Sequence, residues 1–134
     1  MPKAGDSYIV TLRENHLAWG TYRYTDSRTP RRGEAYLPIP MPDAHRFNIY
    51  NSNFTGGRDV LGENIFRCTS HDGFLNTEMK AQGSVREGNV YAKQFSVKGD
   101  LTAIGAWYRH VNAQPGDQIE VRWISDVEMT IRLI

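Results

Sequence analysis

The sequence contains a single cysteine, Cys68, and no apolar run that approaches the roughly 20 residues needed to cross a bilayer. One cysteine excludes an internal disulfide and is typical of a protein in a reducing compartment. The first residues, Met-Pro-Lys-Ala-Gly-Asp, lack the apolar core of a secretory signal. We therefore expect a cytoplasmic protein that makes no contact with a membrane.

A strong charge of one sign is also missing, because 16 basic and 15 acidic residues give a formal net charge of +1. The overall charge therefore gives no argument for a polyanionic partner. The 134 residues are 40% hydrophobic and 23% charged, which suits one compact domain over residues 1–134 and is too little chain for two ordinary domains. No internal repeat or linker-like segment divides the sequence.

Patterns of catalytic or metal-binding residues are scarce. The four histidines stand apart, a Gly-x-Ser-x-Gly elbow is missing, and no Gly-Lys-Ser/Thr of a phosphate-binding loop follows Gly56-Gly57. Asp72, with Glu78 and Lys80 after it, resembles the Asp…Glu-x-Lys metal site of many nucleases. Asp72 falls in a predicted turn and a third carboxylate is not evident. We therefore expect no catalytic residue, no metal and no cofactor, and keep a minimal nuclease as a third hypothesis.

The last third of the chain carries the clearest local pattern. Apolar residues recur at helical spacing over residues 101–112, and Asp100 stands where its carboxylate can cap a helix. After a Pro-Gly-Asp turn the period changes to two, which predicts a half-buried strand over residues 118–124. We expect Trp107 and Trp123, on this helix and this strand, to lie in the core.

Six further strands are predicted from alternation and turn signals. They cover residues 8–12, 34–39, 64–70, 74–82, 89–97 and 127–133. Pro38 indicates an edge or a bulge, Asp72-Gly73 marks a hairpin, and residues 42–47 are typical of a short helix opened by a proline. Strands this short and this close in sequence favour an antiparallel barrel or sandwich. We expect a mainly β fold, a small barrel of seven strands with two short helices.

The arginines are unevenly distributed. Arg23, Arg28, Arg31 and Arg32 fall within ten residues that contain one acid, Asp26. The surrounding segment has dense turn signals and little apolar content, which predicts a protruding loop. A basic loop on a neutral domain can attract a phosphate backbone, and it can equally be a solvated turn without a ligand.

The order of these elements resembles a known family. The segment from Glu34 to Phe47 is similar to the strand, Ile-Pro and short helix of the plant B-three pseudobarrel DNA-binding domains. The closing segment resembles the same family through Leu101, Gly105 and Trp107, followed by Gly116-Asp117 and an alternating strand. The stretches Gln82-Gly83 and Tyr91-Ala-Lys-Gln94 look closer to the bacterial branch, the DNA-recognition domains of EcoRII- and BfiI-type restriction endonucleases. This resemblance covers residues 8–134 and implies an open pseudobarrel.

What the resemblance implies is a wrench-like grip on the major groove of double-stranded DNA by two arms. The first arm would be residues 24–34, from Tyr24 to Glu34. Within it, candidates for guanine edges or phosphates are Arg28, Arg31 and Arg32. Ser27 would hold a phosphate. Glu34 would orient an arginine or accept a hydrogen bond from cytosine.

The second arm would be residues 93–100, before the closing helix. Gln94 is its candidate for an adenine edge. Lys93, Ser96 and Lys98 would hold phosphates. The two arms together would form one groove-binding surface.

Three settings and one alternative stay open. Members of the family belong to larger transcription factors or are fused to a nuclease, whereas we expect this chain to be complete without one. It would then be a recognition subunit beside a nuclease or methyltransferase, a free-standing regulator, or a pseudobarrel that has lost its DNA role. The alternative is a small-molecule or protein-binding β-barrel, which predicts an apolar pocket.

Overall fold

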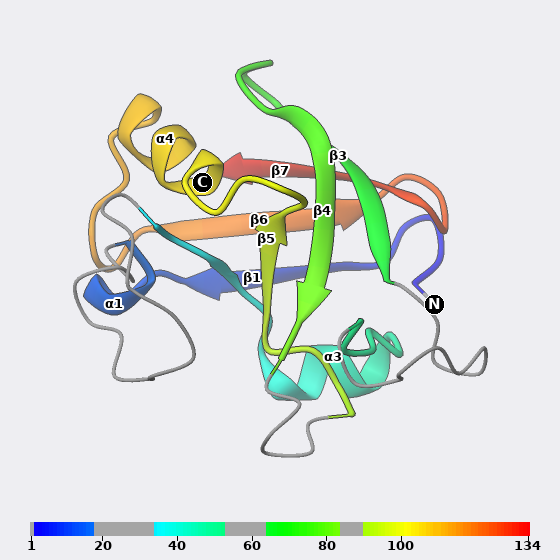
Figure 1. Ribbon diagram of the computed structural model, residues 1–134. Helices are drawn as coiled ribbons and strands as arrows, with labels where there is room; N and C mark the ends of the chain where they lie inside the picture. Colours follow the sequence, from blue (N-terminus) through cyan, green and yellow to red (C-terminus); the bar gives the residue numbers. More distant parts are fainter. Residues whose placement is uncertain (1, 18–33, 53–63, 84–89) are drawn as a thin grey trace.

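The structure, a computed structural model, describes residues 2–17, 34–52, 64–83 and 90–134. These form one mixed sheet of seven strands that curls into a barrel with one unsealed seam (Figure 1). The strands are β1 (Ser7–Thr11), β2 (Leu37–Pro38), β3 (Ile65–Ser70), β4 (Asn76–Gln82), β5 (Gln94–Val97), β6 (Gln118–Trp123) and β7 (Glu128–Leu133). The mainly β, seven-stranded open barrel predicted from the sequence is confirmed.

The order of strands across the sheet is β1-β6-β7-β3-β4-β5-β2, so β1 and β2 are its two edges. Every neighbouring pair is antiparallel except β3 and β7, which are parallel. The expectation of an antiparallel barrel is therefore corrected at one pair. A short turn joins β6 to β7 and reverses the chain. As a result, β7 lies beside β3 and runs in the same direction as β3.

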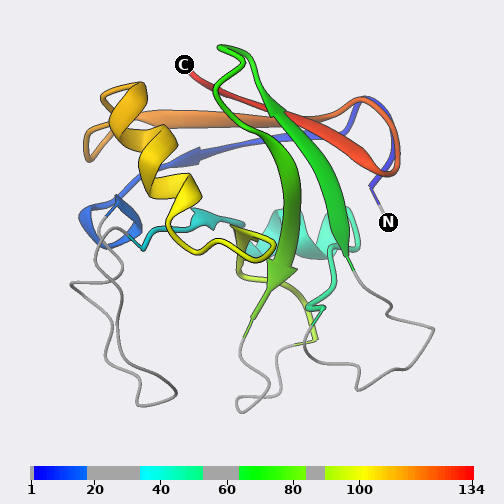
Figure 2. The ribbon, with the colours of Figure 1, turned by 45° about the horizontal axis from the view of Figure 1, so that its top comes forward.

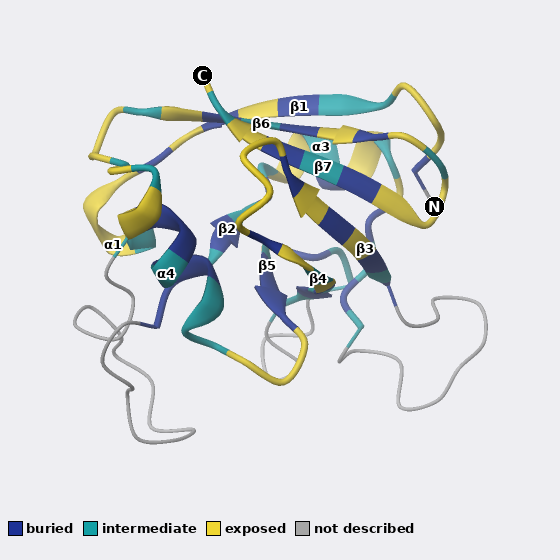
Figure 3. Ribbon diagram, turned by 90° about the horizontal axis from the view of Figure 1, so that it is seen from above, coloured by how far each residue is buried: buried dark blue, intermediate teal, exposed yellow. Residues whose placement is uncertain are grey.

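Alternation along the strands separates the core from the surface. On β6, Ile119, Val121 and Trp123 are buried, while Gln118 and Arg122 on the other face are exposed. Bands of buried and exposed residues alternate in this way along several strands (Figure 3). A period of two matches the pleat of a strand, so one face of each strand enters the barrel.

Large aromatic side chains fill the barrel. Trp123 lies against Phe66 and Phe95, with ring centroids 5.6 and 6.3 Å from its own. The rings of Phe66 and Phe95 meet edge to face, with centroids 6.0 Å apart. This arrangement stabilises an aromatic pair by more than the burial of its apolar area alone. Trp107 is also fully buried, so both tryptophans predicted for the core are there.

In the described ranges three short helices accompany the sheet, α1 (Glu14–Leu17), α3 (Met41–Arg46) and α4 (Ala103–His110), one more than predicted. Of these described helices, none is long and apolar enough to cross a membrane. Helix α4 lies near the β3–β4 turn, and α3 lies toward the other end of these strands (Figure 2). The extra helix, α1, is a single turn in which the side chain of His16 accepts a hydrogen bond from the Arg13 N–H at 3.0 Å.

The start of α4 differs from the prediction in its capping. The helix begins at Ala103, two residues later than predicted, and its N-cap residue, Thr102, makes no side-chain cap. Asp100 instead accepts hydrogen bonds from the N–H and the hydroxyl of Thr102, at 3.0 and 2.8 Å. Its carboxylate therefore fixes the turn that leads into the helix and does not cap the helix itself.

Candidate nucleic-acid interface

The segment that follows the first predicted arm, residues 35–39, runs beside the second predicted arm. Residues 35–39 pair with residues 93–101, with Leu37 opposite Phe95 in the β2–β5 ladder. The Ile39 N–H donates to the Lys93 carbonyl at 2.8 Å, and the Ala35 N–H donates to the Leu101 carbonyl at 3.4 Å. The segment that follows the first predicted arm is thus hydrogen-bonded to residues 93–95 and to Leu101, at the two ends of the second arm.

Most of the first arm lies outside the described residues. This holds for Tyr24, Ser27, Arg28, Arg31 and Arg32. Glu34 is described and is fully buried, and the hydroxyl of Tyr36 donates to its Oε2 at 3.3 Å. Burial argues against contact of Glu34 with a cytosine edge and favours its other predicted role, orientation of an arginine.

The second arm presents three of its four predicted residues. Lys93 and Lys98 are exposed, and Gln94 is half-buried at the start of β5. Ser96 is only 1% exposed, and its hydroxyl donates to Oε1 of Gln82 on β4 at 2.8 Å. A buried hydroxyl that is already bonded does not reach a phosphate, so the predicted phosphate contact of Ser96 finds no support in its placement.

A tight turn holds Lys98 at the end of β5. The Asp100 N–H donates to the Val97 carbonyl at 3.1 Å, and Gly99 between them has a φ of +81°, which glycine adopts without steric cost. The Lys98 N–H donates to the Glu78 carbonyl on β4 at 2.9 Å. The backbone beneath this exposed lysine is therefore fixed by hydrogen bonds on both sides.

Two residues of β4 join this surface that the sequence reasoning missed. Cross-strand pairing sets Lys80 opposite Ser96 and Gln82 opposite Gln94. Met79 and Ala81 point into the core, so Lys80 and Gln82 share the outer face of the sheet with Gln94. Both residue types were visible in the sequence, but only the register of β4 against β5 brings them beside the second arm.

A pocket of about 130 Å³ opens between α1, β2 and β5. Its lining consists of Asn15, His16, Tyr36, Pro38, Lys93 and Gln94. Burial and the neighbouring Arg13 lower the pKa of His16, which favours the neutral imidazole. Because Nδ1 accepts from the Arg13 N–H, the ring proton is on Nε2, which is a hydrogen-bond donor. The pocket can therefore offer an imidazole N–H, two amides and an ammonium to a ligand.

Asp72, the first residue of the nuclease hypothesis, makes contacts that Glu78 and Lys80 do not share. Asp72 accepts from the Ser70 hydroxyl (2.6 Å) and the Phe74 N–H (2.8 Å) with Oδ1, and from the Trp107 indole (2.9 Å) with Oδ2. Desolvation opposes ionisation, but these hydrogen bonds outweigh it and lower the pKa of Asp72. Asp72 thus ties the β3–β4 turn to α4. Within the described ranges, no group of three His, Cys, Asp or Glu side chains could hold a metal ion.

Glu78 and Lys80 lie farther along β4, on the strand itself. Glu78 stands opposite Arg67 in the β3–β4 ladder, and Lys80 stands opposite Ile65. Neither residue is in the turn that holds Asp72, where the carboxylate already has three donors. The contacts of Asp72 favour the structural interpretation of this motif.

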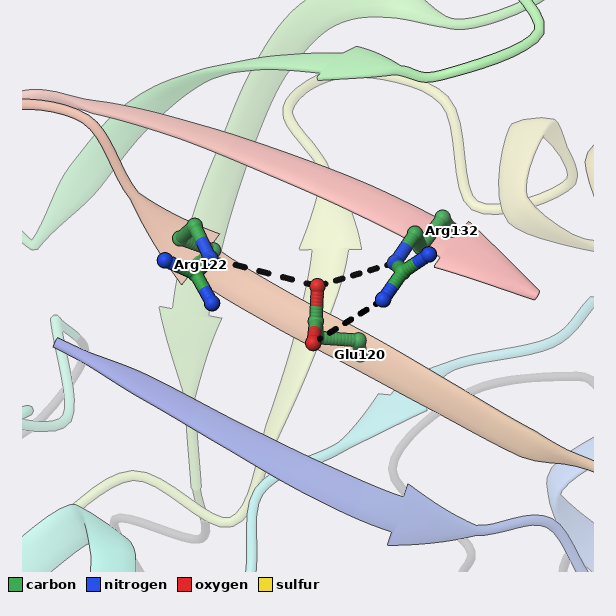
Figure 4. A network of polar contacts seen from close by, with 3 residues as sticks. All are labelled: Glu120, Arg122 and Arg132. Carbon is green, nitrogen blue, oxygen red and sulfur yellow. Dashed lines mark hydrogen bonds and ion pairs between the residues drawn. The ribbon is translucent and has the colours of Figure 1, made fainter. Parts of the chain in front are cut away.

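A second charged cluster lies on the outer face of β6 and β7 (Figure 4). Glu120 accepts from Arg132 through both oxygens, at 2.9 Å from Nε and 3.3 Å from Nη2. Nε of Arg122 lies 3.9 Å from Oε1 of the same carboxylate. The hydrogen bonds from Arg132 are the main cause of the lowered pKa of Glu120. These two arginines are therefore engaged with a carboxylate on β6 and β7, which do not neighbour β5 in the sheet.

Comparison with known proteins assigns no family. No protein-family model matches the chain, and no curated protein matches its sequence.

Proposed function

We propose that this protein is a sequence-specific double-stranded DNA-binding module, without catalysis, whose two arms grip the major groove. The observation that carries the proposal is that residues 35–39 are hydrogen-bonded to residues 93–95 and to Leu101, on an open seven-stranded barrel. Because these segments are hydrogen-bonded neighbours, the C-terminal end of the first arm, residue 34, lies close to the second arm, residues 93–100. Two arms from adjacent strands can enter one groove, which is about 12 Å wide in B-DNA.

The chemistry of the described residues fits contact with DNA. Lys93 and Lys98 are exposed cations for phosphates, and Gln94 carries an amide that can read a base edge. In the first arm, Arg28, Arg31 and Arg32 are the proposed contacts to guanine edges or phosphates. A local set of cations is sufficient, since binding needs charge near the phosphates and does not need a basic protein overall.

We further propose a cytoplasmic setting in a restriction or regulatory system. A recognition module without its own chemistry would act beside a separate nuclease or methyltransferase subunit. The buried thiol of Cys68 is consistent with a reducing compartment, since it is a core residue and not half of a disulfide.

Selection from a random duplex pool tests the proposal. Protein immobilised at moderate salt should enrich one short sequence over successive rounds, and filter binding should then give tighter binding to that sequence than to a scrambled duplex. Sequence-specific proteins exceed their own non-specific affinity by about 10³-fold or more. Failure to enrich any sequence, with binding equal for selected and scrambled duplexes, would remove specific DNA binding.

A second candidate function is the binding of a small molecule or a protein. The pocket between α1, β2 and β5 favours it, because Tyr36 and Pro38 give apolar walls and Asn15 and Gln94 give polar groups. Phe66, Phe95 and Trp123 occupy the barrel interior, so such a ligand would sit in this outer pocket. A metabolite that raises the melting temperature without DNA, and loses this effect in Gln94→Ala, would favour this function.

A further inference from the structure

The side chains of Gln82 and Ser96 form a bonded pair on the outer face of β4 and β5. Ser96 is almost fully buried, while Gln82 beside it is half-buried and reaches the surface. The Ser96 hydroxyl donates to Oε1 of Gln82 at 2.8 Å. Gln94, a predicted DNA contact, is directly opposite Gln82 in the ladder.

This hydrogen bond engages the oxygen end of the Gln82 amide. Oε1 is held by the serine hydroxyl, so the Nε2 amino group is the end left for another partner. Within the described part of the chain, Ser96 is the side chain bonded to this amide. The carboxamide is thus an oriented hydrogen-bond donor, and orientation before binding reduces the entropy lost on contact.

The backbone around the pair is also constrained. The Lys93 N–H donates to the Gln82 carbonyl at 2.7 Å, and the next residue, Gly83, donates its N–H to the side chain of Asn51 at 3.0 Å. A Cβ at Gly83 would lie 3.2 Å from Nδ2 of Asn51, so the chain passes closely there. Gln82 is therefore held at both the backbone and the side chain.

We propose that Gln82 is a further DNA-contacting residue and that Ser96 is the positioning residue that orients it; this rests on the proposed DNA-binding function. The partner is a hydrogen-bond acceptor of the duplex. Oε1 already accepts one hydrogen bond from Ser96, so the amino group is the end of the amide with no bond yet made to a described residue. An acceptor such as O6 or N7 of guanine, or a phosphate oxygen, matches the amino group that Gln82 presents.

A double-mutant cycle on the selected duplex tests the pair. Gln82→Ala should weaken binding about 10-fold, the effect of one good base contact. Ser96→Ala should weaken it by a smaller factor, and the double variant should bind like Gln82→Ala alone, because the serine acts through the glutamine. Ser96→Thr keeps a hydroxyl and should restore binding toward the wild-type value.

The matched control is Gln118→Ala, because Gln118 is also hydrogen-bonded to a hydroxyl across two strands, to Thr11 on β1 at 3.4 Å, but lies on β6. Its loss should leave DNA affinity unchanged. Duplexes with 7-deazaguanine at single positions, which lack N7, and duplexes with single methylphosphonates distinguish contact with N7 of guanine from contact with a phosphate. The contacted position is the one at which the Gln82→Ala effect disappears. Melting temperatures confirm that each variant is folded.

The outcomes separate the two proposals. If the wild type binds no duplex, the DNA-binding function fails and the role of Gln82 fails with it. If the wild type binds and Gln82→Ala binds equally well, only the role of Gln82 is overturned. If Ser96→Ala weakens binding further in the Gln82→Ala background, Ser96 acts through the fold and is not a positioning residue. If Ser96→Ala does not fold, Gln82→Ala and Ser96→Thr still decide.

Discussion

The hydroxyl of Tyr8 on β1 donates a hydrogen bond to the carbonyl oxygen of Pro38 on β2, at 3.1 Å, and so joins the two edge strands across the seam of the barrel. Two residues earlier, the Tyr36 carbonyl accepts from the hydroxyl of Tyr108 on α4 at 2.8 Å. These carbonyls face the edge of β2 opposite to β5, as alternate residues of a strand do. Pro38 has no N–H to leave unpaired there, so a proline and two tyrosines stabilise an edge that pairs with no other described strand.

Replacement of Tyr8 by phenylalanine should destabilise the fold by about 1 kcal/mol, the net value of one buried hydrogen bond. The hydroxyl is lost and the Pro38 carbonyl is left without this donor. Urea denaturation followed by tryptophan fluorescence measures the change. Tyr50→Phe is the control, because its hydroxyl lies on the surface, 3.4 Å from Oδ1 of Asn48, and its loss should have little effect. Equal stability of Tyr8→Phe and wild type would contradict the role of this bond.

The two buried tryptophans should respond differently to phenylalanine. Both are fully buried, but the indole N–H of Trp107 donates to Asp72 at 2.9 Å, while that of Trp123 has no partner among the described residues. Both substitutions remove the same side-chain volume. The difference between their effects on the free energy of unfolding therefore reports the hydrogen bond of Trp107. Trp107→Phe should cost about 1 kcal/mol more than Trp123→Phe in the free energy of unfolding by guanidinium denaturation. A larger cost for Trp123→Phe would count against this assignment.

Stability should decline in acid, in part through Asp72. Hydrogen bonds from Ser70, Phe74 and Trp107 outweigh desolvation and lower the pKa of this carboxyl in the folded state, so the unfolded chain binds its proton more readily. Its contribution is therefore complete above the ordinary carboxyl pKa of about 4 and is lost as the pH falls through the lower folded value. Denaturation midpoints at pH 7, 4 and 3 should show a shallower decline for Asp72→Asn. An equally steep decline in both proteins would refute the contribution of Asp72.

The thiol of Cys68 should be inert while the protein is folded. Cys68 is buried on β3, and burial raises the pKa of its thiol to about 12, so little thiolate forms at pH 8. Labelling with iodoacetamide, followed by mass spectrometry, should be slow in buffer and should rise with urea in step with the loss of structure. Rapid labelling of the folded protein would show that this part of β3 is open to solvent.

Much of the fold could be predicted because most strands have one buried face. The strand predicted over residues 118–124 is observed as β6, since Ile119, Val121 and Trp123 alternate with polar residues. Residues 34–39 shorten to a two-residue strand that pairs with β5 alone among the described strands. Helix α1 was missed, because one turn shows no periodicity and its cap comes from His16. The parallel pairing of β3 with β7 depends on the whole sheet and leaves no local signal.

The candidate site could be predicted in part. The types of Lys93, Gln94 and Lys98 indicated polar contacts, and all three reach the surface. Ser96 follows the same outward register but is buried beside Gln82, a fact that alternation along one strand does not reveal. Gln82 is recognised as part of the candidate site only from the register of β4 against β5, which pairs residues that lie apart in the sequence.

The salt dependence of duplex binding tests the central claim most directly. Dissociation constants for the selected duplex should be measured at several salt concentrations for the wild type, for Arg31→Ala plus Arg32→Ala, and for Lys93→Ala plus Lys98→Ala. A control, Lys3→Ala plus Arg122→Ala, removes the same charge from elsewhere on the barrel. Each phosphate contact contributes about 0.9 to the log–log slope, so each arm variant should bind more weakly with a slope shallower by up to about 2, and the control should match the wild type. Binding without salt dependence, or arm variants indistinguishable from the control, would contradict a two-armed grip on DNA.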